Sequence, residues 1–339
     1  MPNETTPRIT ICIPTFNRCN LLKKALLSVA HQTVKPWETV VVDNCSDDDT
    51  EKVVREFAGV KYFRNETNLE MMDNWNRCIE LATGEFIALL HSDDLISPDW
   101  HEQWLAMIQK NNKPEIGAYF SATFTIDMEE NAKIIYRVFY RETLLKPAEG
   151  FRKLWKRNMC SLPASAAIIY RKAIFNALGK FNKSYSTEAD IAFSLKLLSR
   201  FSIFYTPKLL FAYRVHPFQS FDTDKKIKTD EKRFATLSQH LVIFREFYAQ
   251  LPESRYKTPL FYKRVGYMYI AIAIFCFLSF RFEKAAGYYK LTKKAFPDIL
   301  KNPGDFFRIF LLIAHYAWKL IIGRIEAIRI RTIAKHWII

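Results

Sequence analysis

Short apolar runs alternate with amphipathic stretches along the first part of the chain, and this alternation constrains the fold more than any other feature. Residues 8–14, 39–42 and 60–66 are β-rich, and each run is followed by a stretch with helical apolar spacing before a fourth run at 85–94. Strands that alternate with helices form a mostly parallel sheet with helices on both faces. The sequence therefore predicts an α/β, Rossmann-like domain.

Charge divides the chain into two parts. The net charge is +15, of which residues 1–224 contribute +1 and residues 225–339 contribute +14. A neutral front half followed by a basic, aromatic-rich tail indicates a working domain with a segment that meets an anionic surface, either lipid headgroups or nucleic acid. We expect a catalytic domain at 1–224 and a helical, basic extension at 225–339.

The cysteines and the N-terminus both favour a reducing compartment. The six cysteines are scattered without paired short spacings, so a disulfide framework or a zinc site is not expected. Residues 1–10 contain no apolar core of a signal peptide. We therefore expect the chain to begin in the cytoplasm.

Three polar clusters follow predicted strands, at residues 15–17, 43–44 and 92–94. In an open parallel sheet the ligand lies outside the carboxyl ends of the strands, so the three clusters should open onto one crevice. Adjacent carboxylates at Asp93 and Asp94 suit a divalent cation that in turn holds a phosphate. A polar turn before the helix signal at residues 97–100 is the alternative interpretation of the same pair.

Taken in order, residues 9–18, 38–50, 74–96 and 211–220 resemble the inverting family 2 glycosyltransferases with the GT-A fold. The resemblance covers roughly residues 8–220. It implies a nucleotide-sugar donor, a divalent metal, Mg²⁺ or Mn²⁺, and transfer of the sugar in a single displacement. It also implies that a bound cation neutralises the diphosphate leaving group.

The same resemblance assigns site residues. It implies nucleotide-sugar contacts from Pro14, Thr15, Phe16, Asn17, Asp43, Asn68, Asn76, Ser92, Asp94 and Arg214. It makes Asp93 and His216 the metal ligands. Phe16 would stack on the base and Asp43 would accept an N–H from the base edge, whereas Arg214 would clamp an anion. From the residues alone, Phe16 could equally be a core aromatic and His216 an ordinary loop histidine.

Three positions depart from the family pattern. His91 stands where an acid is common, and a histidine there can hydrogen-bond ribose or bind a softer metal. Glu70 stands in place of a common glycine, and Trp75 in place of a common basic phosphate contact. The identity of the metal and of the phosphate contact therefore stays open at this point.

A single displacement needs a base that takes the proton of the acceptor hydroxyl. Glu188 and Asp190 precede an amphipathic helix, where the resemblance implies the acidic base motif, and aligning the helix places Asp190 as the base with Glu188 as its rival. Without the family, both acids could simply favour the positive end of that helix, worth about 0.3–1 kcal/mol.

The basic tail has helical patterns. Residues 265–280 are uncharged but too few for a bilayer crossing, which takes about 20 residues. Farther on, a single helical stripe is formed by Arg308, His315, Lys319, Glu326 and Arg329. This segment either packs as core or lies in a membrane interface, and the concentrated charge favours the interface.

The sequence thus predicts an enzyme peripheral to the inner face of the cell membrane. It would move a sugar, expected to be UDP-linked, to a hydroxyl of a glycan or lipid-linked glycan in bacterial cell-surface polysaccharide synthesis. Two alternatives stay open. A nucleotidyltransferase would want a glycine-rich loop that the first motif lacks. A nucleic-acid binder would use the tail, but aromatics among long aliphatic runs suit lipid or packing better.

Overall fold

The computed structural model describes residues 6–147, 149–155, 162 and 165–216, together with scattered residues after 216. Contacts divide the chain into two compact units, Met1–His216 with Gly323–Ile339, and Pro217–Ile322. This division differs from the expected 1–224 and 225–339 because the C-terminal residues belong with the first unit. Most of the expected helical extension lies outside the described residues. Within the described part, no helix is both long and apolar enough to cross a membrane.

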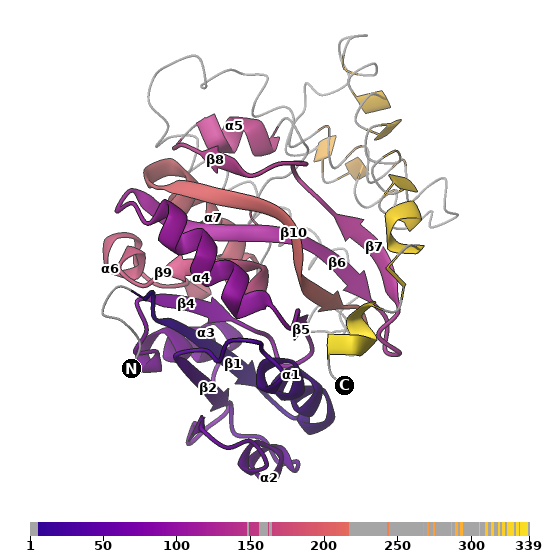
Figure 1. Ribbon diagram of the computed structural model, residues 1–339. Helices are drawn as coiled ribbons and strands as arrows, with labels where there is room; N and C mark the ends of the chain where they lie inside the picture. The colour runs from indigo at the N-terminus through magenta and orange to yellow at the C-terminus, as the bar shows by residue number, and fades with distance from the viewer. Residues whose placement is uncertain are drawn as a thin grey trace. The chain divides into compact units, whose positions relative to one another are not determined.

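Ten described strands form one sheet in the order β3-β2-β1-β4-β9-β6-β10-β5, with β7 beside β6 and β8 beside β10 (Figure 1). The strands are β1 Ile9–Thr15, β2 Glu38–Asp43, β3 Val60–Arg64, β4 Phe86–Leu89, β5 Leu95–Ile96, β6 Ile116–Ile126, β7 Ala132–Tyr136, β8 Thr143–Leu145, β9 Ile168–Arg171 and β10 Ser202–Arg214. The first four are parallel to one another, and β10 is parallel to β6. The sheet is mixed because β5, β7, β8 and β9 run antiparallel to their neighbours.

Helices cover both faces of the parallel part, as the alternating pattern predicts. The described helices are α1 Cys19–Ala30, α2 Thr50–Arg55, α3 Met71–Leu81, α4 Trp100–Asn111, α5 Glu149–Trp155, α6 Ile174–Leu178 and α7 Ala189–Arg200. Alternate residues of β1 serve opposite faces. Ile11 shares one core with Leu26 of α1 and Trp100 of α4, whereas the thiol of Cys12 donates to the Cys78 carbonyl of α3 at 3.4 Å.

The C-terminal residues pack against the sheet edge formed by β6 and β7. The Trp337 ring lies 5.2 Å from that of Phe124, and the Ala132 amide donates to the Arg331 carbonyl at 2.8 Å. Glu326 pairs with Arg137 at 2.7 Å. Of the predicted charged stripe only Glu326 lies in the described residues, and it belongs to the first unit.

Candidate functional site

The polar clusters meet at the carboxyl ends of β1, β2 and β4, as the sheet rule predicts. Thr15 and Asp43 are register partners at the ends of neighbouring parallel strands, and the Asn44 amide donates to the Thr15 carbonyl at 2.9 Å. The Leu90 amide donates to the Cys12 carbonyl at 2.8 Å, which carries the chain after β4 to the same edge. Pro14, Thr15 and Ser92 are buried there.

The Asp93 carboxylate is the centre of a charged cluster. Its Oδ2 accepts hydrogen bonds from Arg18 at 2.7 Å and from His216 at 3.0 Å. Burial alone would raise the pKa of Asp93, but the His216 hydrogen bond and the nearby charge of Arg18 hold the pKa below its usual value. Asp93 is therefore ionised at neutral pH.

His91, Asp93 and Asp94 form a group that could hold a cation. One ligand atom from each lies within 4.8 Å of the others. Burial lowers the pKa of His91, so its imidazole is neutral and able to ligate, and its Nε2 has no hydrogen-bond partner within the described residues. Two carboxylates with an imidazole fit a divalent ion such as Mn²⁺, which accepts nitrogen as well as oxygen ligands. His216 touches this group through Asp93.

Arg214, which the resemblance implies as an anion clamp, makes its described contacts within the protein, and a contact with a phosphate stays a prediction. It is fully buried. Its Nε donates to the Asp93 carbonyl at 2.8 Å, and its amide donates to the Asp94 carboxylate at 2.9 Å. Its guanidinium also pairs with Glu130 at 2.8 Å, and Glu130 pairs with Lys24. Arg214 therefore fixes the turn that carries the two acids.

The two candidate amides hold loops together. Asn76 donates to the Phe181 carbonyl at 2.8 Å and accepts from the Phe181 amide at 3.0 Å, so both ends of its side chain are used. Asn68 accepts a hydrogen bond from Asn44 at 2.7 Å. In this structure the Asn76 amide makes a structural contact, and its expected contact with the nucleotide stays a prediction. Trp75 lies with its ring 4.8 Å from that of His91.

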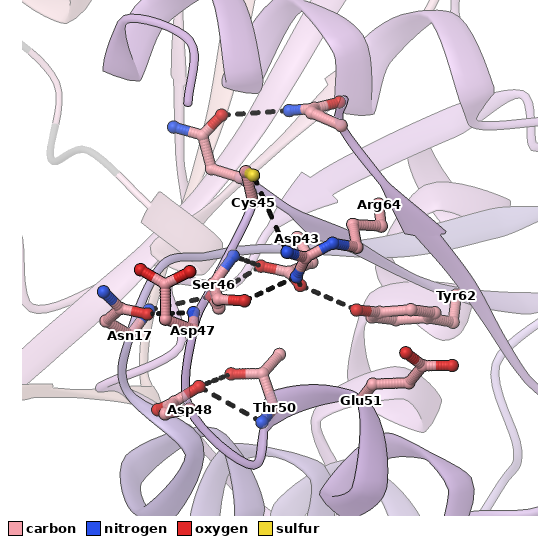
Figure 2. Close-up of polar contacts among 12 residues, drawn as sticks. Asn17, Asp43, Cys45, Ser46, Asp47, Asp48, Thr50, Glu51, Tyr62 and Arg64 are labelled. Atoms are coloured by element: carbon pink, nitrogen blue, oxygen red, sulfur yellow. Dashed lines mark hydrogen bonds and ion pairs between the residues drawn. The ribbon is translucent and has the colours of Figure 1, made fainter. Parts of the chain in front are cut away.

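Figure 2 shows the surroundings of Asp43, which is fully buried at the end of β2. Its Oδ1 accepts from the Ser46 amide at 3.0 Å and the Ser46 hydroxyl at 2.5 Å. Its Oδ2 accepts from Tyr62 at 2.6 Å and from Arg64 at 3.1 Å. Four donors therefore surround the carboxylate that was expected to accept from a base.

The turn after β1 is tied to this cluster. Asn17 has a φ of 49°, its amide donates to the Ser46 hydroxyl at 2.8 Å, and its side chain accepts from the Asp47 amide at 2.7 Å (Figure 2). An asparagine tolerates this left-handed conformation better than most residues. The Phe16 ring is 39% exposed and is therefore not a core aromatic.

Both base candidates lie at the start of α7. Glu188 ends the 3-10 helix η2, Lys183–Glu188, and is buried, whereas Asp190 is half-buried in the first turn of α7. Asp190 accepts a hydrogen bond from the Ile191 amide at 2.7 Å. Burial, and then the charge of Asp190, raises the pKa of Tyr170.

Arg18 is a site residue that the sequence reasoning missed. It directly precedes α1 and pairs with Asp93, although 75 residues separate them in the chain. Its position just after the polar cluster at 15–17 could have signalled a role at the strand ends.

Several comparisons place this architecture among known proteins. A protein of Mycobacterium bovis described as a PGL/p-HBAD biosynthesis glycosyltransferase is 29% identical over 201 residues, covering 57% of this chain and 70% of the relative. A GalNAc(5)-diNAcBac-PP-undecaprenol beta-1,3-glucosyltransferase of Campylobacter jejuni is 38% identical over 93 residues, 26% of this chain and 30% of the relative.

Solved structures share the fold. Residues 1–349 of S. aureus TarS in complex with UDP-GlcNAc superpose with a TM-score of 0.57 at 17% identity, covering 85% of this chain and 91% of the other. The mannosyltransferase PcManGT from Pyrobaculum calidifontis, with GDP-Man and Mn²⁺, gives 0.53 at 16% identity, covering 95% and 87%. The family model described as Glycosyl transferase family 2 matches residues 10–179. The chain therefore belongs to glycosyl transferase family 2.

Proposed function

We propose that this glycosyltransferase uses a divalent cation to transfer a sugar, with inversion, from a nucleoside diphosphate sugar to an acceptor hydroxyl. The observation that carries the proposal is the His91, Asp93 and Asp94 group at the carboxyl ends of the parallel strands. A donor with two phosphates needs its negative charge neutralised there, and a cation held by these residues would do so. UDP is the proposed nucleotide, and one structural neighbour was solved with UDP-GlcNAc.

The chain's own residues prepare the site for this reaction. Arg214 holds the acid turn through its bonds to the backbone of Asp93 and to the carboxylate of Asp94. Arg18 and His216 both hydrogen-bond one carboxylate oxygen of Asp93 and so fix its orientation. When bound, the cation would stabilise the charge that develops on the diphosphate leaving group. Preorganised charges of this kind need little rearrangement as the glycosidic bond breaks.

The acceptor hydroxyl must lose its proton as it attacks the anomeric carbon from the face opposite the leaving group. Asp190 is the proposed general base, because it stands half-buried in the first turn of α7 where a carboxylate remains reachable. Glu188, which is more deeply buried, is the rival. The proton would pass from the hydroxyl oxygen to one carboxylate oxygen.

The proposed acceptor is a glycan or lipid-linked glycan in cell-surface polysaccharide synthesis. The Campylobacter relative is named for a glycan on undecaprenyl diphosphate. A nucleotidyltransferase or nucleic-acid binder is a weaker proposal. The family model covers residues 10–179, which include the polar clusters at the ends of β1, β2 and β4.

We also propose that the tail rests on the inner face of the cell membrane. Ile325 and Ile328, three residues apart in the C-terminal part of the first unit, share one helical face and are 48% and 73% exposed. Glu326, by contrast, pairs with Arg137. Exposed apolar side chains next to Arg324, in a tail of net charge +14, suit the boundary between acyl chains and anionic headgroups.

Nucleotide binding gives a direct test of the proposed donor. At 100 times Kd, a ligand that binds only the folded protein adds about 2.7 kcal/mol, which raises the melting temperature by roughly 5–10 °C. We expect UDP-sugars to give this shift with Mn²⁺ or Mg²⁺ and to lose it with a chelator. If no nucleoside diphosphate raised the melting temperature, the proposal would be contradicted.

The membrane proposal predicts that Ile325→Glu with Ile328→Glu weakens binding to vesicles of phosphatidylglycerol by at least about tenfold, because two apolar anchors become charged. Flotation with the vesicles measures this. Tyr140→Glu changes another exposed apolar residue, 71% exposed, and should bind as the wild type does. Equal binding of all three proteins would count against a lipid-facing tail.

A further inference from the structure

Glu130 lies in the turn between β6 and β7 and combines two features that each cost free energy. Its backbone has a φ of 59°, a left-handed conformation that suits glycine or asparagine better than glutamate. Its residue is only 7% exposed, although a carboxylate is rarely buried unless it is paired. Strained residues of this kind persist where the surrounding contacts fix them, and they cluster at functional sites.

Two cations share the Glu130 carboxylate. Its Oε1 accepts hydrogen bonds from the Lys24 ammonium of α1 at 2.6 Å and from Nη1 of Arg214 at 2.8 Å. The Lys24 side chain is 35% exposed, whereas the Arg214 side chain is fully buried. Water therefore screens the pair with Lys24 more than the pair with Arg214. The contact of Glu130 that matters most for the interior is the one with Arg214.

Arg214 carries this contact to the turn of Asp93 and Asp94. Its Nε donates to the Asp93 carbonyl at 2.8 Å, and its backbone amide donates to the Asp94 carboxylate at 2.9 Å. A guanidinium is planar and holds its donors in a fixed fork. The position of Nη1 against Glu130 therefore also sets the direction in which Nε meets Asp93.

The turn that presents Glu130 is ordered by its own hydrogen bonds. The Asp127 carboxylate accepts from the Asn131 amide at 2.8 Å and from the Glu129 amide at 3.1 Å. The Asp127 carbonyl accepts from the Glu130 amide at 3.2 Å and from Arg214 at 3.1 Å. Glu130 is thus held in place by the turn and does not depend on Arg214 for its position.

We propose that Glu130 is a positioning residue of sugar transfer, which holds the turn of Asp93 and Asp94 through Arg214 in the conformation that takes the cation. The inference rests on the proposed cation site. Glu130 acts on the ligands and touches neither the donor nor the cation. Groups that orient metal ligands in this way typically contribute a factor of about 10–100 to metal affinity.

The test is the affinity for Mn²⁺, measured by calorimetry in the presence of UDP and without turnover. Glu130→Gln keeps the size of the side chain and removes its charge, so the Kd for Mn²⁺ should rise about tenfold to a hundredfold. Glu130→Asp keeps the charge and should bind Mn²⁺ more tightly than Glu130→Gln does. In turnover, the Glu130→Gln defect should fall on the apparent KM for Mn²⁺, with kcat largely restored at saturating metal.

Two control variants separate this role from a general effect on the fold. Glu129→Gln makes the same chemical change at the exposed neighbour and should bind Mn²⁺ as the wild type does. Lys24→Met removes the solvent-facing partner of Glu130 and leaves the pair with Arg214, so it should also keep wild-type affinity for Mn²⁺.

Three results would overturn the inference. Glu130→Gln might melt at a lower temperature yet bind Mn²⁺ as tightly as the wild type, and Glu130 would then serve stability alone. Equal losses of Mn²⁺ affinity in Lys24→Met and Glu130→Gln would place the constraint in α1 and not in Arg214. If Glu130→Gln does not fold, an affinity of Glu130→Asp that equals that of the wild type would show that the side-chain geometry is not used. Absence of Mn²⁺ binding by the wild type is a separate result, which would overturn the proposed cation site itself.

Discussion

Asp93→Asn should reduce sugar transfer by at least about 10²–10³, the loss typical when one electrostatic contact to a transition state is removed. The amide has nearly the shape of the carboxylate but carries no charge, so a cation would keep only Asp94 as a charged ligand in the group. The variant should also lose the metal-dependent part of donor binding. Turnover and calorimetry with increasing Mn²⁺ measure both effects.

Acid stability gives this variant a second readout. The folded-state pKa of Asp93 lies below its ordinary value of 3.8, so the wild type gains stability that is present above that pH and is lost as the pH falls through the folded value. Asp93→Asn removes this dependence. Asp73→Asn makes the same change on α3, where Asp73 pairs with Lys183, and should keep full activity. Unchanged metal dependence in Asp93→Asn would rule out the cation site.

Asp190→Asn should lower sugar transfer by about 10²–10⁴, the usual contribution of a general base, and leave donor affinity unchanged. The proposed nucleotide contacts lie at the ends of β1 and β2, whereas the proposed general base lies at the start of α7. The effect should therefore fall on kcat while the Kd for the nucleotide stays constant. Steady-state kinetics with a saturating donor measures the first, and calorimetry measures the second.

Glu188→Gln is the matched comparison. Glu188 is 6% exposed, so an acceptor hydroxyl has less access to it than to Asp190. We expect Glu188→Gln to retain most of the transfer activity. If it loses transfer while Asp190→Asn retains it, the base assignment belongs to Glu188. If neither variant loses transfer activity, neither acid at the start of α7 acts as the general base.

The parallel half of the fold followed from the sequence because its signals are local. Ile9–Thr15 is a buried apolar run, and Leu22 and Leu26 lie at helical spacing on the buried side of the next helix. Both patterns arise within one β–α unit. The antiparallel additions are different, because β9 and β5 are short and pair with strands distant in the chain. Spacing along the sequence carries little information about such pairings.

The site divides in the same way. The clusters at strand ends converge because parallel strands share an edge, so the neighbourhood of Asp93 could be predicted. Partners could not. Arg214 looked like a loop cation, yet a fully buried guanidinium must be paired, and its partner Glu130 lies in a different turn. The side-chain amide of Asn76 donates to the Phe181 carbonyl, and this contact is evident only in the folded chain.

The most direct measurement of the central claim is a crystal structure with UDP and Mn²⁺, in which anomalous scattering locates the manganese. We expect the manganese within about 2.0–2.6 Å of an Asp93 oxygen, next to the diphosphate, with the nucleobase stacked on Phe16. A cavity of about 350 Å³ lined by Arg8, Arg171 and Lys172 lies at the opposite edge of the sheet, where β1 and β4 begin. Nucleotide bound in that cavity, with no manganese at Asp93, would contradict the account.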